Sequence, residues 1–198
     1  VEEEGGVLKY VETAADRVWI GALTARLEGH HIAIIGVGGT GSYIRDQIAK
    51  APVSEIRLID GDDFLQHNAF RAPGAPSINT LREVPKKVDY LAGIYGQMHR
   101  RIVTYAVRIR QDSLTLLDGI TFAFLCMDAG EPKRLAMQKL EDMGVSFIDV
   151  GMGLELVGGS LGGILRVTTS TPEKRDHIRT RVSFKESGAE NVYASNIQ

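Results

Sequence analysis

Four glycines within six residues call for a physical reason, because glycine loses more backbone entropy on folding than any other residue. Gly36, Gly38, Gly39 and Gly41 lie between a branched apolar run and a helical pattern. In that context the first glycine permits a tight turn, the second lets backbone approach phosphate, and the third lets helix pack on strand. The N–H groups that open the helix favour an anion. The loop therefore predicts a nucleotide site.

An acidic residue follows this loop at the distance that ribose recognition requires. Asp60 ends a second apolar run about 20 residues after the loop, where a carboxylate typically holds ribose hydroxyls. A nicotinamide dehydrogenase explains the loop and this acid as well as an ATP-binding protein does. A tight strand–helix turn without a ligand is a further alternative.

The residues that follow favour a triphosphate over a nicotinamide. They are Asp62, Asn68, Arg71, the pair Lys86 and Lys87, and Asp128 at the end of a later apolar run. Arginine forks onto phosphate oxygens and lysine supplies a compact positive charge. A carboxylate can hold Mg²⁺ together with phosphate and water. Hydride transfer needs none of these groups.

Alternating strand and helix patterns must position these residues. The sequence predicts an α/β fold: a Rossmann-like, doubly wound, mostly parallel sheet with helices on both faces and a C-terminal antiparallel hairpin. Strands are expected over 31–36, 55–60, 102–109, 121–128 and 145–151, the hairpin over 154–169 with its turn at Gly158 and Gly159, and helices over 42–51, 86–100 and 131–144. Ligands bind at the carboxyl ends of such strands.

The length of 198 residues suits one domain spanning 1–198. A helical segment is expected over 11–28 and a loop over 61–84. The polar tail 171–198 has no assigned structure. It ends without a closing element, which leaves open whether the domain continues beyond it.

Composition argues against several function classes. A net charge of −2 gives no reason to expect a nucleic acid or a membrane surface as partner. The single cysteine, Cys126, excludes a disulfide framework or a multi-cysteine zinc site within these residues and fits a reducing cytoplasm. Apolar runs stay shorter than the roughly 18 residues of a membrane span. The acidic N-terminus does not have the layout of a signal peptide.

In order along the chain, these motifs resemble the ubiquitin-activating-enzyme-like adenylation family, that of the sulfur-carrier activators ThiF and MoeB. The family's G-x-G-G-x-G-S loop is matched by Gly36 to Ser42. Its D-x-D and N-x-x-R motifs are matched by Asp60, Asp62, Asn68 and Arg71. Lys87-Val88-Asp89 and Cys126-Met127-Asp128 match two further signatures. The resemblance covers roughly residues 17–168.

The resemblance implies an activity and a role for each matched residue. A partner's C-terminal carboxylate, on a small ubiquitin-like or sulfur-carrier protein, attacks the α-phosphate of ATP and gives an acyl-adenylate and pyrophosphate. Asp60 would hold the ribose and Asn68 would orient phosphates. Arg71 and Lys87 would neutralise them, with Lys86 as a stand-in for Lys87. Asp128 would hold Mg²⁺. The resemblance also implies a homodimer in which Arg17 would reach the partner's nucleotide.

The sequence departs from the family pattern at three points. Ala129 replaces the asparagine that usually follows the strand-end aspartate. Paired C-x-x-C motifs are absent, so no zinc is expected. No cysteine follows Cys126, which occupies a buried strand position and is not expected to be a nucleophile. Other members activate a tRNA-attached base or a peptide C-terminus, and these acceptors stay open. An NAD(P)-dependent oxidoreductase and a non-catalytic ATP-binding scaffold remain as alternatives.

Overall fold

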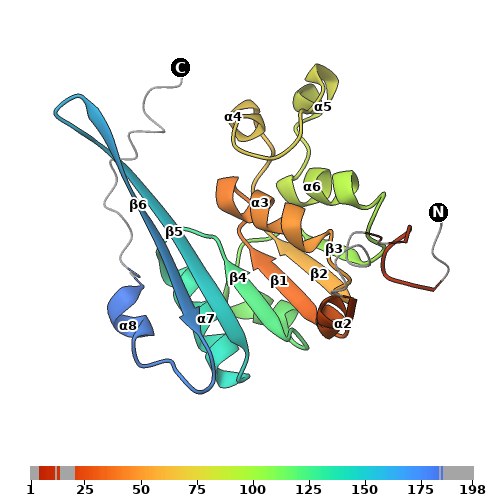
Figure 1. Ribbon diagram of the computed structural model, residues 1–198. Coiled ribbons are helices and arrows are strands. Elements are labelled where there is room, and N and C mark those ends of the chain that lie inside the picture. Colours follow the sequence, from red (N-terminus) through yellow and green to blue (C-terminus); the bar gives the residue numbers. More distant parts are fainter. Residues whose placement is uncertain (1–4, 12, 14–20, 183, 185–198) are drawn as a thin grey trace.

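The computed structural model describes residues 5–11, 13, 21–182 and 184, and these form a six-stranded sheet in the order β3-β2-β1-β4-β5-β6 (Figure 1). The strands are β1 (His31–Ile35), β2 (Glu55–Ile59), β3 (Ile102–Tyr105), β4 (Phe122–Leu125), β5 (Ser146–Val157) and β6 (Ser160–Ser170). The first five strands are parallel along the sheet, and β6 pairs antiparallel with β5. The predicted α/β class, with its mostly parallel sheet and terminal hairpin, is confirmed.

Helices cover both faces of the sheet. The helices α3 (Gly39–Ile48) and α6 (Lys87–Tyr95) pack on one face, where Ile34 and Leu58 lie in the same buried cluster as Leu91. The 3-10 helix η2 (Gln111–Leu117) and helix α7 (Glu131–Asp142) pack on the other face. Successive strand residues point to opposite faces, so a sheet buried on both sides needs the near-continuous apolar strands that the sequence has.

The C-terminal hairpin is longer than the sequence predicted. The expected strand 145–151 and the first strand of the expected hairpin form one continuous strand, β5, and the turn falls at Gly158 and Gly159 as predicted. Pairing between β4 and β5 ends at Leu125 and Asp149. Beyond that point β5 and β6 continue as a two-stranded ribbon that projects past the other strands (Figure 1).

The expected loop 61–84 contains two short helices instead, α4 (Gln66–Ala69) and α5 (Ile78–Glu83). Ser77 starts α5 because its Oγ accepts a hydrogen bond from the N–H of Thr80 at 3.0 Å. Val84 ends it in the left-handed conformation, with φ of 48°. Neither helix is evident in the sequence, because the clustered prolines and Gly74 interrupt so short a helical pattern.

The remaining differences concern element ends. The expected strands 102–109 and 121–128 stop at Tyr105 and Leu125, where their pairing with the neighbouring strands ends. Of the expected helical segment 11–28, Gly21–Thr24 forms helix α2 and Ala25–Leu27 forms 3-10 helix η1; residues 12 and 14–20 lie outside the described part. The tail contains the short helix α8 (Ile178–Arg181). No helix in the described part of the chain is long and apolar enough to cross a membrane.

Candidate nucleotide site

Four parallel strands end level with one another, and this brings the predicted residues to one edge of the sheet. Ile35 at the end of β1 lies opposite Ile59 of β2 and Leu125 of β4, and Ile59 lies opposite Tyr105 of β3. The glycine loop, Asp60 and the 126–128 segment follow these strand ends directly. The edge is the one at which doubly wound sheets bind ligands.

Steric contacts explain two of the four loop glycines. Gly36 has φ of +86°, and a Cβ there would lie 2.7 Å from the carbonyl oxygen of Cys126. A Cβ on Gly41 would overlap the carbonyl oxygen of Gly36. In contrast, nothing lies within 4 Å of the Cβ position of Gly38. Gly36 and Gly41 are therefore required by protein packing, whereas Gly38 faces open space that a ligand can enter.

Asp60 ties the glycine loop to the second strand. One carboxylate oxygen accepts from the N–H of Val37 at 2.9 Å, and the other accepts from the N–H of Asp62 at 2.9 Å. An ionised carboxylate offers about four lone-pair sites, so it can still accept from ribose hydroxyls. Asp60 thus lies where the sequence analysis expected it.

Asp62 lies between two cations at this edge. Its Oδ2 is 2.9 Å from Nζ of Lys87 and its Oδ1 is 2.8 Å from Nη2 of Arg108, while Nζ of Lys87 is also 4.0 Å from Asp60. The hydrogen bond from Lys87 lowers the pKa of Asp62, with a smaller contribution from Arg108. We call Asp60, Asp62, Lys87 and Arg108 the edge ion cluster. Lys87 begins α6 and is nearly buried, so its ammonium is held in place.

Arg71 and Asn68 come from the segment around α4. The Cβ position of Gly39 lies 3.7 Å from Cβ of Arg71, so this exposed arginine stands over the glycine loop. Asn68 is buried, and its Oδ1 accepts from the N–H of Leu65 at 2.8 Å, which stabilises the start of α4. Burial lowers the pKa of His67, and the positive charges of Arg71 and Lys87 lower it further. Arg71 and Lys87 therefore lie close enough to α4 to act on the same group there.

Asp128 and Cys126 follow β4. Asp128 is exposed, three residues beyond the last residue of the strand. Cys126 is half-buried, and its Cβ lies 3.3 Å from the Cβ position of Gly41. Burial, with a further contribution from Asp149, raises the pKa of its thiol to about 12. A thiol this hard to ionise is a packing residue, as the sequence analysis expected.

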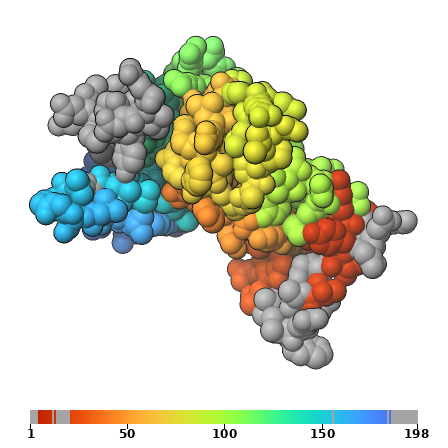
Figure 2. Space-filling model, turned by 90° about the horizontal axis from the view of Figure 1, so that it is seen from above, coloured from red at the N-terminus to blue at the C-terminus, as the bar shows by residue number. Residues whose placement is uncertain are grey.

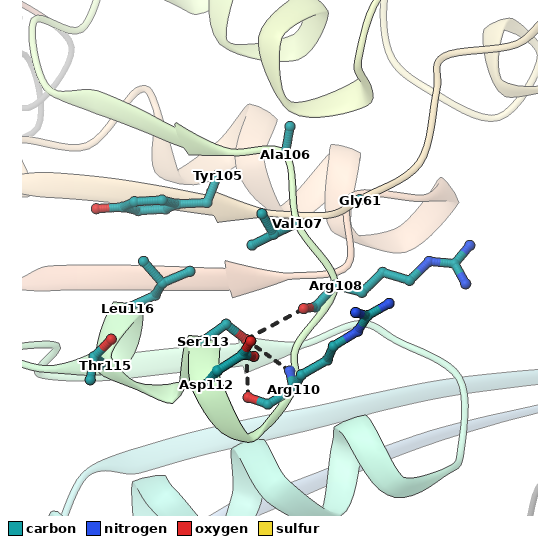
Figure 3. A pocket seen from close by; sticks show the side chains of 10 residues that line it. All are labelled: Gly61, Tyr105, Ala106, Val107, Arg108, Arg110, Asp112, Ser113, Thr115 and Leu116. Atoms are coloured by element: carbon teal, nitrogen blue, oxygen red, sulfur yellow. Dashed lines mark hydrogen bonds between the residues drawn. The ribbon is translucent and has the colours of Figure 1, made fainter.

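A pocket of about 600 Å³ adjoins the edge ion cluster (Figure 3). It lies between Gly61 and the segment that joins β3 to η2, with the Tyr105 ring and Leu116 on one side and Arg108 and Arg110 on the other. The hydroxyl of Ser113 accepts from the N–H of Arg110 at 2.8 Å and so shapes the turn. The volume is in the range of small-molecule sites.

A second group of charges lies at the base of the hairpin. Asp149 of β5 is fully buried; its Oδ1 is 2.7 Å from Nζ of Lys133 on α7, and its Oδ2 is 3.0 Å from Nη2 of Arg166 on β6. Lys133 is only 2% exposed. We call these three residues the hairpin-base ion cluster. It fixes the hairpin to α7 beneath the site.

The structure brings together most of the predicted site residues and adds several that the sequence analysis missed. The glycine loop, Asp60, Asp62, Arg71 and Lys87 are linked by contacts, whereas Arg17 lies outside the described residues. Arg108 was missed because it was assigned to the interior of a strand. If the third strand had been predicted to end opposite Ile59, as it does in the structure, Arg108 would have been placed at the ligand-binding edge of the sheet. Among the described residues, no group of three or more His, Cys, Asp or Glu could hold a metal ion.

Comparison with known protein sequences gives three findings. A profile of the ThiF family matches residues 12–175. The tRNA threonylcarbamoyladenosine dehydratase of Haemophilus influenzae is 43% identical over 92 residues, which cover 46% of this chain and 30% of that protein. Ubiquitin-like modifier-activating enzyme 5 of Oryza sativa subsp. japonica is 20% identical over 148 residues, 69% of this chain and 35% of that protein. The chain spans about a third of the length of these two curated relatives.

Solved structures agree on the fold. The E. coli tRNA N6-threonylcarbamoyladenosine dehydratase in complex with ATP has a TM-score of 0.58 with 18% identity, over 71% of this chain and 63% of that one. At this identity the likeness establishes a shared fold.

Proposed function

Since the chain belongs to the ThiF family, we propose that it activates the C-terminal carboxylate of a small ubiquitin-like or sulfur-carrier protein by ATP-dependent adenylation. The observation that carries the proposal is the edge of the sheet: open space over Gly38 lies beside a nearly buried lysine and an arginine that stands over the loop. The ATP complex of a structural relative supports a nucleotide at this fold.

The nucleotide can be assigned part by part. The ribose hydroxyls would donate to Asp60, whose carboxylate is already oriented by two backbone N–H groups. The base would enter the pocket beside Arg108, and the phosphates would pass over Gly38 toward Arg71. Backbone N–H groups at the start of α3 would add donors to the phosphate oxygens.

Lys87 would change partners when the triphosphate binds. Its ammonium is shared between Asp62 and Asp60 in the free protein. A triphosphate carries several negative charges, whereas the carboxylate of Asp62 carries one and its side chain is 43% exposed to screening water. Arg108 stays bonded to Asp62 and limits the cost of the exchange. Lys87 therefore has a negatively charged partner before and after the triphosphate binds, and it is never an unpaired buried charge.

Mg²⁺ fits the donors at this edge. It binds through one or two carboxylates together with phosphates and water, so the exposed carboxylate of Asp128 would suffice. When bound, the ion would neutralise charge on the phosphates.

Catalysis of the reaction requires mainly that the reactants be positioned and that the charge on the phosphate oxygens be neutralised. An oxygen of the partner's carboxylate attacks the α-phosphorus, the bond from this phosphorus to the bridging oxygen breaks, and that oxygen leaves with pyrophosphate. Arg71 and Lys87 would stabilise the charge that develops on the phosphate oxygens. With a thiol pKa of about 12, Cys126 takes no part.

The acceptor could belong to another class within the family. The relative that is 43% identical is named for a modified tRNA base, which favours a tRNA-attached acceptor as the second candidate. A homodimer of the chain is also part of this proposal.

Exchange of labelled pyrophosphate into ATP tests the proposal, with a panel of ubiquitin-like proteins and a modified tRNA as acceptors. We expect exchange that depends on Mg²⁺ and on a free C-terminal carboxylate, and a loss of about 100-fold in Arg71→Ala. Arg82→Ala, an exposed arginine on α5, is the matched control and should retain activity.

Calorimetric titration with Mg-ATP and, separately, NADH distinguishes the alternatives. Binding of NADH that is insensitive to Arg71→Ala would refute the adenylation proposal in favour of an oxidoreductase. Mg-ATP binding without exchange for any acceptor would support a scaffold.

A further inference from the structure

The hairpin-base ion cluster has one more positive charge than negative charge. Lys133 on α7 and Arg166 on β6 both bond to the single carboxylate of Asp149. The carboxylate is fully buried and the lysine is 2% exposed, so water screens the excess charge only weakly. In the part of the chain that the structure describes, no second acid forms an ion pair with either cation. Because buried charges in proteins are normally paired, the cluster favours binding of an anion.

Unpartnered polar atoms lie on the same side of the hairpin as this excess charge. Residues opposite each other in an antiparallel pair point to the same side, as do residues two apart on one strand. Arg166, Thr168 and Ser170 therefore share one side with Asp149. Nε of Arg166 and the hydroxyl oxygens of Thr168 and Ser170 are buried, and no described residue forms a hydrogen bond with any of them. Since buried polar groups normally have a partner, these atoms indicate a polar ligand.

Arg166 is the member of the cluster that a ligand can reach, because its side chain is 35% exposed. Its guanidinium lies across Gly151 of β5, where a Cβ would be 2.9 Å from Nη2. Nothing lies within 4 Å of the Cβ position of Gly153, the next residue on this side of the strand. Nη2 donates to Asp149 at 3.0 Å, which leaves other N–H donors of the guanidinium for a ligand. An extended ligand can therefore lie over Gly153 and bind to Arg166.

The cluster adjoins the glycine loop through Cys126. In the pairing of β4 with β5, Asp149 lies opposite Leu125, the residue before this cysteine. Burial raises the thiol pKa of Cys126 and the charge of Asp149 raises it further, so the carboxylate is close to the sulfur. Cβ of Cys126 is in turn 3.3 Å from the Cβ position of Gly41. A group that is bound by Arg166 would thus be near phosphates that lie over the loop.

We propose that Arg166 binds the C-terminal carboxylate of the acceptor chain before this carboxylate attacks ATP. The inference rests on the proposed function and adds to it a binding residue for the acceptor. One negative charge on a carboxylate matches the one excess positive charge of the cluster, whereas a phosphate group would bring more. The planar guanidinium also suits carboxylate oxygens. When one oxygen accepts from Nε, the other oxygen stays free to attack the α-phosphorus.

The shape of the hairpin gives the acceptor a path to Arg166. The distal hairpin stands at the margin of the molecule (Figure 2, light blue). Arg166 lies toward the base of the hairpin, away from the turn at Gly158 and Gly159. The last residues of an acceptor can run along the ribbon toward its base, over the backbone of Gly153, and end at the guanidinium.

Calorimetric titration with acetyl-glycylglycine and with its C-terminal amide tests the carboxylate site. The two probes have the same backbone and differ in the charge at the C-terminus. We expect the 198-residue chain to bind the acid roughly 10-fold or more tightly than the amide, and Arg166→Gln to lose this preference. Arg179→Gln, which changes an exposed arginine on α8, is the matched control and should keep it. Equal binding of acid and amide by the wild type, or a preference that survives in Arg166→Gln, would overturn the proposal.

A second variant tests the site without changing the ion cluster. Gly153→Val fills the open space beside Arg166 with a residue that suits a strand, so the fold should be kept. We expect this variant to lose the preference for the acid. Met152→Val, which changes the neighbouring residue on the opposite side of the hairpin, should bind both probes as the wild type does. Wild-type preference in Gly153→Val would contradict the path over β5.

Mg-ATP titration and pyrophosphate exchange separate this inference from the proposed function. Arg166→Gln should bind Mg-ATP as the wild type does, because Arg71 and Lys87 are unchanged. It should raise the KM for the acceptor with little change in kcat, since binding of the acceptor is what is lost. Equal KM values in wild type and Arg166→Gln would refute the inference and leave the proposed function standing. A wild type that prefers the acid probe but exchanges no pyrophosphate would refute the proposed function and leave Arg166 as a carboxylate site.

Discussion

The edge ion cluster and the hairpin-base ion cluster each hold a carboxylate between a lysine and an arginine, yet they differ in exposure. Asp62 and Arg108 are 43% and 72% exposed, whereas Asp149 and Lys133 are at most 2% exposed. Charges in water can exchange one partner for another at little cost, but buried charges cannot. The same three residue types therefore suit the proposed binding site in one place and a structural anchor in the other.

Removal of the buried carboxylate gives the largest expected effect. Asp149→Ala leaves Lys133 and Arg166 without their acid, and loss of one partner of a buried pair costs about 3–5 kcal/mol. Urea unfolding measures this change. Asp63→Ala breaks the exposed pair with Lys86 and should cost less than about 1 kcal/mol. Equal costs for the two variants would show that burial does not set the cost of losing a carboxylate, which is the basis of the distinction between the clusters.

Two glycines of the loop allow the requirements of protein packing and of ligand binding to be tested separately. Gly41→Ala places a methyl group against the carbonyl oxygen of Gly36, so it should destabilise the fold by about 1–3 kcal/mol and abolish ATP binding. Gly38→Ala meets no protein atom, so its unfolding free energy should stay within about 1 kcal/mol of wild type. Its ATP affinity should still fall at least 10-fold, because the methyl occupies the phosphate's space. Unchanged ATP affinity in Gly38→Ala would place the phosphates elsewhere.

Lys87 tests whether the edge ion cluster exchanges partners. Lys87→Ala should weaken Mg-ATP binding by about 30-fold, roughly 2 kcal/mol, since one charge-assisted contact is lost. Calorimetry measures this, with Lys86→Ala as the neighbouring control. If Lys86→Ala has the larger effect, the second of the adjacent lysines is not the phosphate ligand.

The smallest expected effect is a change in the free energy of unfolding at acidic pH. Lys87 and Arg108 lower the pKa of Asp62 below its usual value of 3.8. The folded protein thus holds Asp62 ionised where the unfolded chain is protonated, so its contribution to stability is present above about pH 4 and is lost as the pH falls through the folded-state pKa. Urea unfolding at pH 7 and pH 3 should show the difference between wild type and Asp62→Asn shrinking at pH 3. A difference that grows there would contradict the sign of the shift.

The sheet could be predicted from the sequence because parallel strands buried on both faces are short apolar runs between helices. The glycine loop and Asp60 could be placed for the same reason, as they follow strand ends directly. The short helices α4 and α5 could not, since one or two turns carry too little periodicity. Asp149 was missed for a different reason: its partners lie 16 and 17 residues away on two other elements. Only the pairing of β5 with β6 and the packing of α7 on β5 bring them together.

The pairing of β1 with both β2 and β4 has a consequence for folding. Gly36 follows β1 but is packed against Cys126, about 90 positions later in the chain. Contacts this distant in sequence close late and slow a folding reaction. During synthesis the first three strands and their helices can associate on their own, yet the glycine loop has no fixed wall until β4 docks. The nucleotide site should therefore be completed in one of the last steps of folding, and ATP should bind only to chains that have passed it.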